Sequence, residues 1–362
     1  MTTAPPAIRA RAGGHVELWC RDLISCLQAT FGTVLLHAGH DALSALGLHW
    51  EFRYQAGDVR SEEFYYPCAV PGDLAASLMP HHPVGSRWHR APDGDRPLAP
   101  LAAELERGGL VIAAVDNFFL PFRPAFGDVH AAHLLVVYGI DEERGTARVS
   151  DAMPPAFSGE IPIEDFLRSW SSANPSDVQD AFFSDSRIGR RYLTVTVGSP
   201  FPVLDRASLA AAFDHSLALF GREPKAGDTQ AIGLAGLDAF LDSLVTAAWS
   251  GRAAALQEAY PFGWGMQAQA GLHGELLRSW GMRENVPAVS EAGRLVESVA
   301  HAWTGLRMCA AHGHSGPRAA APELARHAKA LRRAYETAVT AVAEAREALE
   351  PVEAVREPRE AP

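Results

Sequence analysis

The sequence predicts an α+β domain followed by an all-α domain, and three features support this fold class. Between about residues 15 and 200, apolar runs of strand length alternate with amphipathic helical segments and Gly- or Pro-containing turns. After Pro202 the composition changes, and the pattern stays helical to about residue 349. A chain of 362 residues also exceeds the usual single core, so two packed units are expected.

The mixed part contains two clear helices and four clear strands. A helical stripe beginning at Cys26 ends at Gly39, a typical C-cap, and a second helix stops at Gly108. The expected elements are helices over 26–38 and 98–107 and strands over 110–115, 134–140, 146–151 and 191–198.

The second part is predicted to be a helical bundle. Its last helix carries Leu324, Leu331 and Tyr335 on one apolar stripe, and its other face is charged. The expected helices cover 206–220, 231–250, a segment around 271–280, 289–311 and 323–349. The domain organisation is therefore a flexible N-terminus (1–14), a mixed domain (15–200), a helical domain (201–349) and a Pro-, Glu- and Arg-rich disordered tail (350–362).

Charge and hydropathy exclude several classes of protein. A formal charge of −11 disfavours nucleic acid and anionic membranes as main partners, because the overall field repels them. The first twenty residues lack the apolar core of a signal peptide, and no apolar stretch approaches bilayer length. We therefore expect a cytoplasmic protein.

The chain has four cysteines, Cys20, Cys26, Cys68 and Cys309, and no Cys-x-x-Cys pair. This spacing argues against a disulfide framework and a thiolate zinc site. Cys26 opens a helix with Ser25 as its N-cap, and the positive end of the helix dipole favours the reactive thiolate. Cys26 is therefore a better nucleophile candidate than Cys20, and Cys68 and Cys309 are expected to be packing residues.

A histidine and a carboxylate follow more than a hundred residues later on a predicted hairpin. With a turn near Glu142, the residue numbers of two directly opposed residues in the hairpin add up to about 284. This register sets His133 opposite Asp151 on the same face. A carboxylate beside a histidine orients the ring and stabilises its protonated form after it takes a thiol proton. Such a pair can equally be a structural hydrogen bond.

The stretches around Cys26 and His133 resemble the N-terminal half of the butirosin biosynthesis protein H family. The most specific block is His130-Ala-Ala-His133-Leu-Leu-Val-Val-Tyr-Gly-Ile-Asp141. The other similar stretches are 26–39, 43–47, 50–54, 115–122 and 149–151. The resemblance covers roughly residues 15–200, with a looser match to the helical C-terminal half that such proteins often carry.

The resemblance implies a papain-like cysteine fold and an acyltransferase of antibiotic biosynthesis. Cys26 would be the nucleophile, His133 the base and Asp151 the orienter of a catalytic triad. The acyl group would come from a thioester on the phosphopantetheine arm of an acyl, peptidyl or amino-group carrier protein. A small-molecule amine would accept it, between molecules or within one chain, the latter a cyclisation. No metal or organic cofactor is expected, because the thiol supplies covalent catalysis.

Four further residues are candidates for substrate binding: Asp116, Asn117, Arg123 and Trp50. Asp116 follows a strand and either binds a substrate amine or lines the cleft with Asn117, or it simply caps the strand. Arg123 either meets a carboxylate or phosphate or is solvated. Trp50 lies in one of the stretches that carry the resemblance.

Two other functions remain open. A cysteine peptidase, amidohydrolase or thioesterase would use the same triad with water as acceptor. A non-catalytic partner in a biosynthetic complex is favoured by the lack of any glutamine before Gln28, because a papain-type enzyme places an oxyanion-binding glutamine there.

Two basic clusters stand out from the acidic background, and either can attract an anionic carrier protein. A charged outer helix face explains the second cluster equally well. They comprise Arg187, Arg190 and Arg191, and Arg326, Lys329, Arg332 and Arg333. The sequence is also compatible with a dimer. The scattered histidines, such as His37 and His40, follow no recognised metal motif and are expected at helix ends or on the surface.

Overall fold

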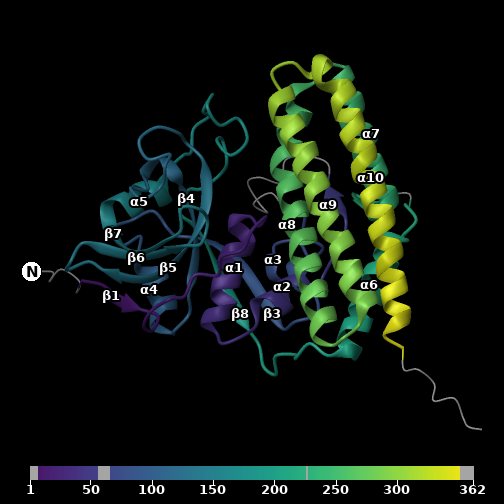
Figure 1. Cartoon of the computed structure of the whole chain (residues 1–362). Helices are drawn as coiled ribbons and strands as arrows, with labels where there is room; N and C mark the ends of the chain where they lie inside the picture. Colours follow the sequence, from purple (N-terminus) through teal and green to yellow (C-terminus); the bar gives the residue numbers. More distant parts are fainter. Residues whose placement is uncertain (1–6, 56–65, 226, 351–362) are drawn as a thin grey trace, which may run out of the picture.

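The computed structural model describes residues 7–55, 66–225 and 227–350. It is a mixed α/β protein with a mostly antiparallel sheet and a C-terminal helical region (Figure 1). The helix and strand positions expected from the sequence are largely present. The expected tail lies outside the described residues from 351 onward.

The main sheet has seven strands in the order β3-β8-β4-β5-β6-β7, and β1 pairs with the far end of β5. Its described strands pair antiparallel throughout. The strands are β1 (Arg9–Arg11), β3 (Val84–Arg90), β4 (Val111–Asp116), β5 (Ala132–Asp141), β6 (Thr146–Asp151), β7 (Phe157–Pro162) and β8 (Arg191–Val197).

The N-terminus differs from its expected flexibility, because Arg9–Arg11 pairs with Gly139–Asp141 at the end of β5. The pairing is reinforced by the backbone N–H of Ile8, which donates to the Glu142 carboxylate at 2.7 Å. The short β1 therefore belongs to the sheet.

Helices of the mixed region pack on this sheet. Helix α1 contacts β5 and β6, and Figure 1 shows it between the sheet and the helical bundle. Helix α5 contacts β4, β6 and β7, and α4 contacts β1, β4 and β5. The bounds are α1 (Cys26–His37), α2 (Ala42–Gly47), α3 (Leu74–Leu78), α4 (Ala99–Glu106), η1 (Asn117–Phe119) and α5 (Ile163–Ser171).

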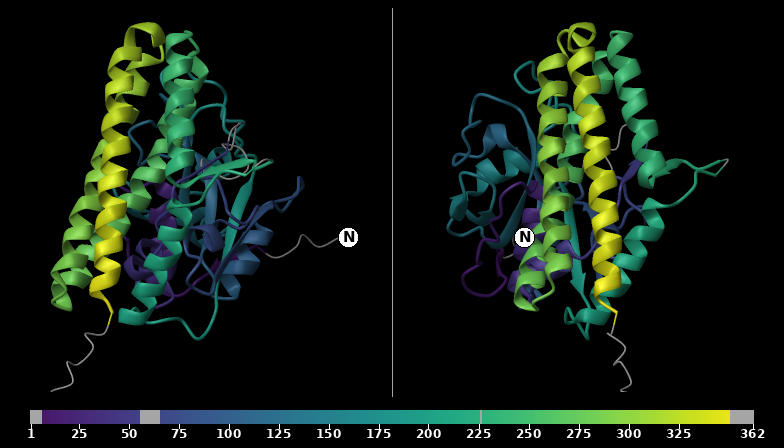
Figure 2. Two further views of the ribbon diagram at one scale, coloured as in Figure 1. Left: turned by 90° about the vertical axis from the view of Figure 1, so that its right-hand side faces the viewer. Right: turned by 45° about the vertical axis from the view of Figure 1, so that its right-hand side comes forward.

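Four long helices form a bundle beside the sheet, and Figure 2 shows them running alongside one another. They follow the shorter α6, and Pro residues lie within two of them, Pro261 in α8 and Pro322 in α10. The bounds are α6 (Arg206–Phe220), α7 (Gly233–Trp249), α8 (Ala253–Arg283), α9 (Pro287–Gly313) and α10 (Pro317–Ala348). No helix in the described part of the chain has both the length and the apolar character needed to cross a membrane.

The two parts share one hydrophobic core. Strand β2 (Arg53–Gln55) belongs to the first part of the chain but pairs with β9 (Gln230–Ile232), which lies between α6 and α7. The adjacent Trp50 and Phe52 are fully buried, and the Trp50 ring lies 4.5 Å from that of Phe220. Residue 200 therefore marks a change of secondary structure, while the core continues across it.

Candidate active site

Cys26 is the first residue of α1, as expected. Ser25 has an extended backbone and caps the helix by accepting the N–H of Leu27. Upstream, the indole of Trp19 packs flat against α1, where a Cβ on Gly32 would lie 1.9 Å from its Cε3 atom. The N–H of Trp19 also donates to the Thr33 hydroxyl. These contacts fix the segment that leads into Cys26.

His133 and Asp151 lie on adjacent strands, but the expected register is wrong. Near the turn the numbers of paired residues add up to 287, as in Asp141 with Thr146. Beyond a bulge at Tyr138 they add up to 286. Without the bulge His133 would face the side of the sheet opposite to Asp151, since one residue of register changes the face. The extra residue restores the shared face, although the two side chains meet diagonally rather than directly opposite.

The two side chains form a buried hydrogen-bonded pair. His133 Nε2 lies 2.8 Å from Asp151 Oδ2, and their side chains are 6% and 1% exposed. An ionised carboxylate only accepts, so Nε2 carries the proton and Nδ1 is left for another partner. Burial alone would lower the pKa of His133. The charge and hydrogen bond of Asp151, followed by the side chain of Cys26, instead raise that pKa to about 9.

Arg123 is a third member of this pair. Its Nη1 donates to the same Asp151 Oδ2 at 3.2 Å and to the carbonyl oxygens of Met153 and Pro154. Burial raises the pKa of Asp151, but His133, Arg123 and the N–H of Met153 together hold it below its usual value. Arg123 therefore binds a carboxylate, but one that belongs to the protein.

Cys26 and His133 line one cavity of about 150 Å³. The cavity is formed by the helix α1 start, the strand ends of the sheet, a loop over residues 172–186, here called the wall loop, and helix α8. It is lined by Ser25, Cys26, Leu27, Tyr66, Asn117, Arg123, Ala131, Ala132, His133, Met153, Asp180, Phe183, Pro261, Trp264 and Gly265.

Helix α8 closes the cavity from the helical region. The Trp264 indole N–H donates to the Ile24 carbonyl at 3.0 Å, two residues before Cys26. The Trp264 ring also meets the Phe183 ring edge to face at 5.5 Å. The second part of the chain thus supplies one wall of the site.

Two polar atoms on cavity-lining residues are buried without a hydrogen-bond partner, Asn117 Oδ1 and Arg123 Nε. Buried polar groups in proteins usually have partners. Of the four expected substrate-binding residues, Asn117 and Arg123 therefore lie on the cavity with hydrogen-bonding capacity to spare.

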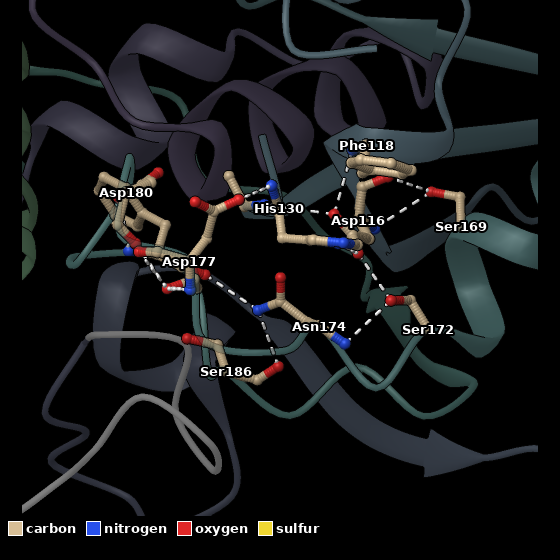
Figure 3. A network of polar contacts seen from close by, with 12 residues as sticks. Asp116, Phe118, His130, Ser169, Ser172, Asn174, Asp177, Asp180 and Ser186 are labelled. Atoms are coloured by element: carbon tan, nitrogen blue, oxygen red, sulfur yellow. Dashed lines mark hydrogen bonds and ion pairs between the residues drawn. The ribbon is translucent and has the colours of Figure 1, made fainter. Parts of the chain in front are cut away.

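Asp116 does not line this cavity, because its carboxylate is fully buried and occupied. Oδ1 accepts the N–H groups of Phe118 and Ala131, and Oδ2 accepts from Ser172 Oγ at 2.6 Å and His130 Nδ1 at 2.7 Å. Figure 3 shows this network. A substrate amine has no access to it, so the strand-capping interpretation describes Asp116 better.

The network instead holds the wall loop. The N–H of His130 donates to Asp177, and Ser172 bridges to Asp116, as Figure 3 shows. Within the loop, Asn174 Nδ2 donates to the carbonyls of Phe183 and Ser186. The Phe183 carbonyl in turn accepts the N–H of Ala132, next to His133. The loop is therefore fixed to the strand that carries the histidine.

Trp50 is also absent from the cavity. It lies in the aromatic core, stacked 5.6 Å from His273 and 5.7 Å from Tyr335. With no exposed surface it cannot touch a substrate. Its expected substrate-binding role is wrong because the strand after it enters the core between the two parts.

The other cysteines form no disulfide and lie away from this cavity. Cys20 is exposed and Cys68 is buried, and neither they nor Cys309 line the cavity around His133. Among the described residues, no group of three or more His, Cys, Asp or Glu side chains is arranged to hold a metal ion.

Several arginines of the two basic clusters form contacts with other residues of the protein. Arg332 pairs with Asp238 and donates to the Leu234 carbonyl of α7, and Arg190 pairs with Asp93. The guanidinium of Arg191 lies 4.3 Å from the centre of the Trp88 ring. These contacts give several of the arginines a structural role.

Sequence reasoning missed the cavity residues of α8 and the wall loop, among them Trp264, Phe183 and Asp180. Trp264 lies on a helix with apolar residues on most faces, and no periodicity distinguishes a cavity-lining tryptophan from a core one. The stretch Asn174-Pro-Ser-Asp177 with Asp180 is typical of a loop with side-chain caps, and this signal could have placed the loop but not the strand that it meets.

Comparison with known proteins agrees with the resemblance of the cysteine and histidine segments. Residues 25–152 match the family model described as butirosin biosynthesis protein H, N-terminal. No curated protein matches the chain. The matched segment begins at the N-cap of α1 and ends one residue after Asp151, so it contains all three members of the candidate triad. Over residues 25–152 the chain is therefore similar to the butirosin biosynthesis protein H N-terminal family.

Proposed function

We propose that this protein is a cysteine-dependent acyltransferase of antibiotic biosynthesis, which moves an acyl group from a carrier-protein thioester to an amine. One observation carries the proposal. The thiol of Cys26 and the buried, hydrogen-bonded His133–Asp151 pair lie on one cavity, with the free ring nitrogen of His133 available to the thiol. The name of the matching family supports the biosynthetic context.

We further interpret the mixed region as papain-like. In support, the nucleophile begins a helix that packs on an antiparallel sheet, and the base and orienter come from neighbouring strands of that sheet. Such an arrangement is recognised by geometry and roles rather than by sequence position.

In the first step the Cys26 thiolate attacks the thioester carbonyl, with His133 protonated beside it. Sulfur–carbon bond formation places the negative charge on the carbonyl oxygen. Collapse then breaks the bond to the pantetheine sulfur, which takes the proton from His133 and leaves as a thiol. The products are acyl-Cys26 and neutral His133.

In the second step a neutral amine attacks the acyl-Cys26 carbonyl, and His133 accepts the proton that the amine loses. Collapse breaks the carbon–sulfur bond, which releases the amide and restores the thiolate beside protonated His133. Because its pKa is raised to about 9, His133 is protonated at neutral pH before the first step and can supply the proton that the pantetheine sulfur takes.

The first turn of α1 is the best candidate for holding the transient oxyanion. The first N–H groups of a helix have no intrahelical acceptor, and they create a positive potential that stabilises a nearby anion. Gln28 lies in the same turn; its Oε1 accepts from Ser25 Oγ, and among the described residues its buried Nε2 has no hydrogen-bond partner. The Cys26 N–H and Gln28 Nε2 are therefore the candidate donors to the oxyanion.

Acylation of Cys26 is the direct test. Protein is mixed with an acylated carrier protein or with butanoyl-N-acetylcysteamine and weighed as intact protein by mass spectrometry. We expect one acyl increment on the wild type and on Cys20→Ser, the matched control, and none on Cys26→Ala.

The effect of an added amine on the acyl-enzyme then distinguishes acyl transfer from the two alternative functions. Release of the increment as an amide on adding an amine supports acyl transfer. Release to water at the same rate with or without the amine instead identifies a thioesterase or hydrolase. Absence of any increment on the wild type contradicts an enzyme of this kind and favours the non-catalytic partner.

A further inference from the structure

Asp180 is an acidic residue that lines the cavity containing Cys26 and His133. It belongs to the wall loop, whose polar contacts are drawn in Figure 3. Its Oδ1 accepts the N–H groups of Phe182 and Phe183, each at 3.0 Å. In the part of the chain that the structure describes, no cationic side chain forms an ion pair with it.

Capping the loop does not explain the charge of Asp180. A cap needs one acceptor oxygen, which an Asn or Ser side chain supplies equally well. A carboxylate in a partly buried wall costs desolvation free energy unless a cation compensates it. Consistent with that cost, burial raises the pKa of Asp180, although its two backbone N–H donors oppose the change.

The rest of the cavity wall also suits a cation. Phe183 and Trp264 bring aromatic rings to the same cavity, and ring faces attract ammonium groups. Arg123 and His133 both donate to Asp151, which compensates one of their two positive charges, and the Cys26 thiolate compensates the other when its proton is on His133. The charge of Asp180 is then the one negative charge on the cavity that these cationic side chains do not compensate.

We propose that Asp180 determines specificity by binding a protonated amino group on the ligand that reaches Cys26. The inference rests on the proposed acyl transfer and deepens it by naming the residue that recognises the ligand. The ammonium belongs either to the acyl group or to the acceptor, and both present the same chemistry to Asp180.

Three methanethiosulfonate reagents of different charge test the electrostatic effect of Asp180 on the cavity, and this test does not require acyl transfer. The Cys26 thiolate forms a disulfide with the reagent's sulfenyl sulfur, the bond to the sulfonyl sulfur breaks, and methanesulfinate leaves. The reagents are aminoethyl (cationic), propyl (neutral) and sulfonatoethyl (anionic) methanethiosulfonate. Peptide mass mapping follows the reaction at Cys26 separately from the other cysteines.

We expect Asp180→Asn to lower the ratio of the aminoethyl to the propyl rate at Cys26 by about tenfold. Asp177→Asn is the matched control, because it removes the same charge three residues away on a side chain that does not line the cavity. An unchanged ratio in Asp180→Asn, or an equal fall in Asp177→Asn, overturns the proposal.

Two further arms identify the source of the ammonium. The donor arm compares acylation of Cys26 by β-alanyl- and butanoyl-N-acetylcysteamine, which differ in a terminal ammonium or methyl group. The acceptor arm compares release of butanoyl-Cys26 by 1,3-diaminopropane and n-butylamine. Loss of the wild-type preference in Asp180→Asn assigns the ammonium to the arm in which it occurs, and loss in neither arm overturns the specificity role.

The two proposals fail in different ways. If neither thioester acylates wild-type Cys26 while the aminoethyl preference depends on Asp180, the acyl transfer is wrong and the cation-binding wall stands. If acylation and transfer proceed but no preference depends on Asp180, the acyl transfer stands and the cation-binding role of Asp180 is wrong.

Discussion

His133 Nε2 and Arg123 Nη1 donate to the same oxygen of Asp151, which makes this carboxylate the electrostatic centre of the site. The other oxygen accepts the N–H of Met153 at 2.9 Å. A buried carboxylate with three donors is held ionised and rigid. The carboxylate interacts with the permanent charge of Arg123 and with the titratable charge of His133. Each of these two donors therefore weakens the electrostatic interaction of Asp151 with the other.

The raised pKa of His133 makes folding stability depend on pH. The pKa is about 9 in the folded protein against 6.5 for the ordinary side chain, so the folded state binds the proton more tightly. The stabilisation is complete below about pH 6.5 and disappears as the pH rises through about 9, with a total of roughly 3 kcal/mol. Asp151→Asn should remove most of this dependence. Urea unfolding of both proteins from pH 6 to 10 measures it, and parallel curves would show that Asp151 does not raise the pKa.

Arg123 should act on catalysis through the same oxygen. Replacing it by Met leaves the whole charge of Asp151 to His133, so the pKa of His133 rises further. The alkaline limb of the pH profile for Cys26 acylation should then move to higher pH, whereas Asp151→Asn moves it to lower pH. A purely structural Arg123 would lower the rate at every pH and leave the limb in place.

At the scale of elements, helix α1 and the bulge in β5 determine where the reacting groups lie. The start of α1 was predictable because Ser25 and Cys26 form a local capping pattern. The bulge at Tyr138 was not, since nothing in Leu134–Ile140 identifies which residue is extra. The sequence therefore predicted that His133 and Asp151 meet, but through a register that the structure corrects.

The close packing of Trp19 on α1 should be intolerant of any side chain at position 32. In Gly32→Ala the new methyl group would meet the indole at 1.9 Å, so we expect destabilisation of about 1–3 kcal/mol and a slower reaction of Cys26 with iodoacetamide. Gly271→Ala is the control, because its methyl group would only reach Leu23 Cβ at 3.6 Å. There the better helix propensity of Ala should leave the protein equally or more stable. Equal thermal midpoints for the two variants would contradict this account.

Over the whole molecule, the active site depends on contacts between segments far apart in the chain. Trp264 reaches the cavity only because α8 packs beside the sheet, where Trp264 contacts the Ile24 carbonyl and the Phe183 ring. Local patterns such as caps and periodicity carry no information about such neighbours, which is why the pairing of His133 with Asp151 could be predicted from sequence and most of the residues around the pair could not.

The shared core predicts that both parts unfold together. Trp50 precedes β2 in the first part, but its ring packs on Phe220 of α6 and Tyr335 of α10. Trp50→Ala should therefore destabilise sheet and bundle alike by about 3–5 kcal/mol, because it opens a cavity in the core common to both.

Urea unfolding checks this with two probes, the far-ultraviolet circular dichroism of the helices and the iodoacetamide reactivity of Cys26 beside the sheet. The transitions should coincide in the wild type and move together in Trp50→Ala. The control Trp249→Ala removes a half-exposed indole from α7 and should move neither by more than about 0.5–1 kcal/mol. Two separate transitions in the wild type, or a shift confined to the helical signal, would mean that the bundle and the sheet are independent units. In that case α8 could leave the cavity without unfolding of the sheet.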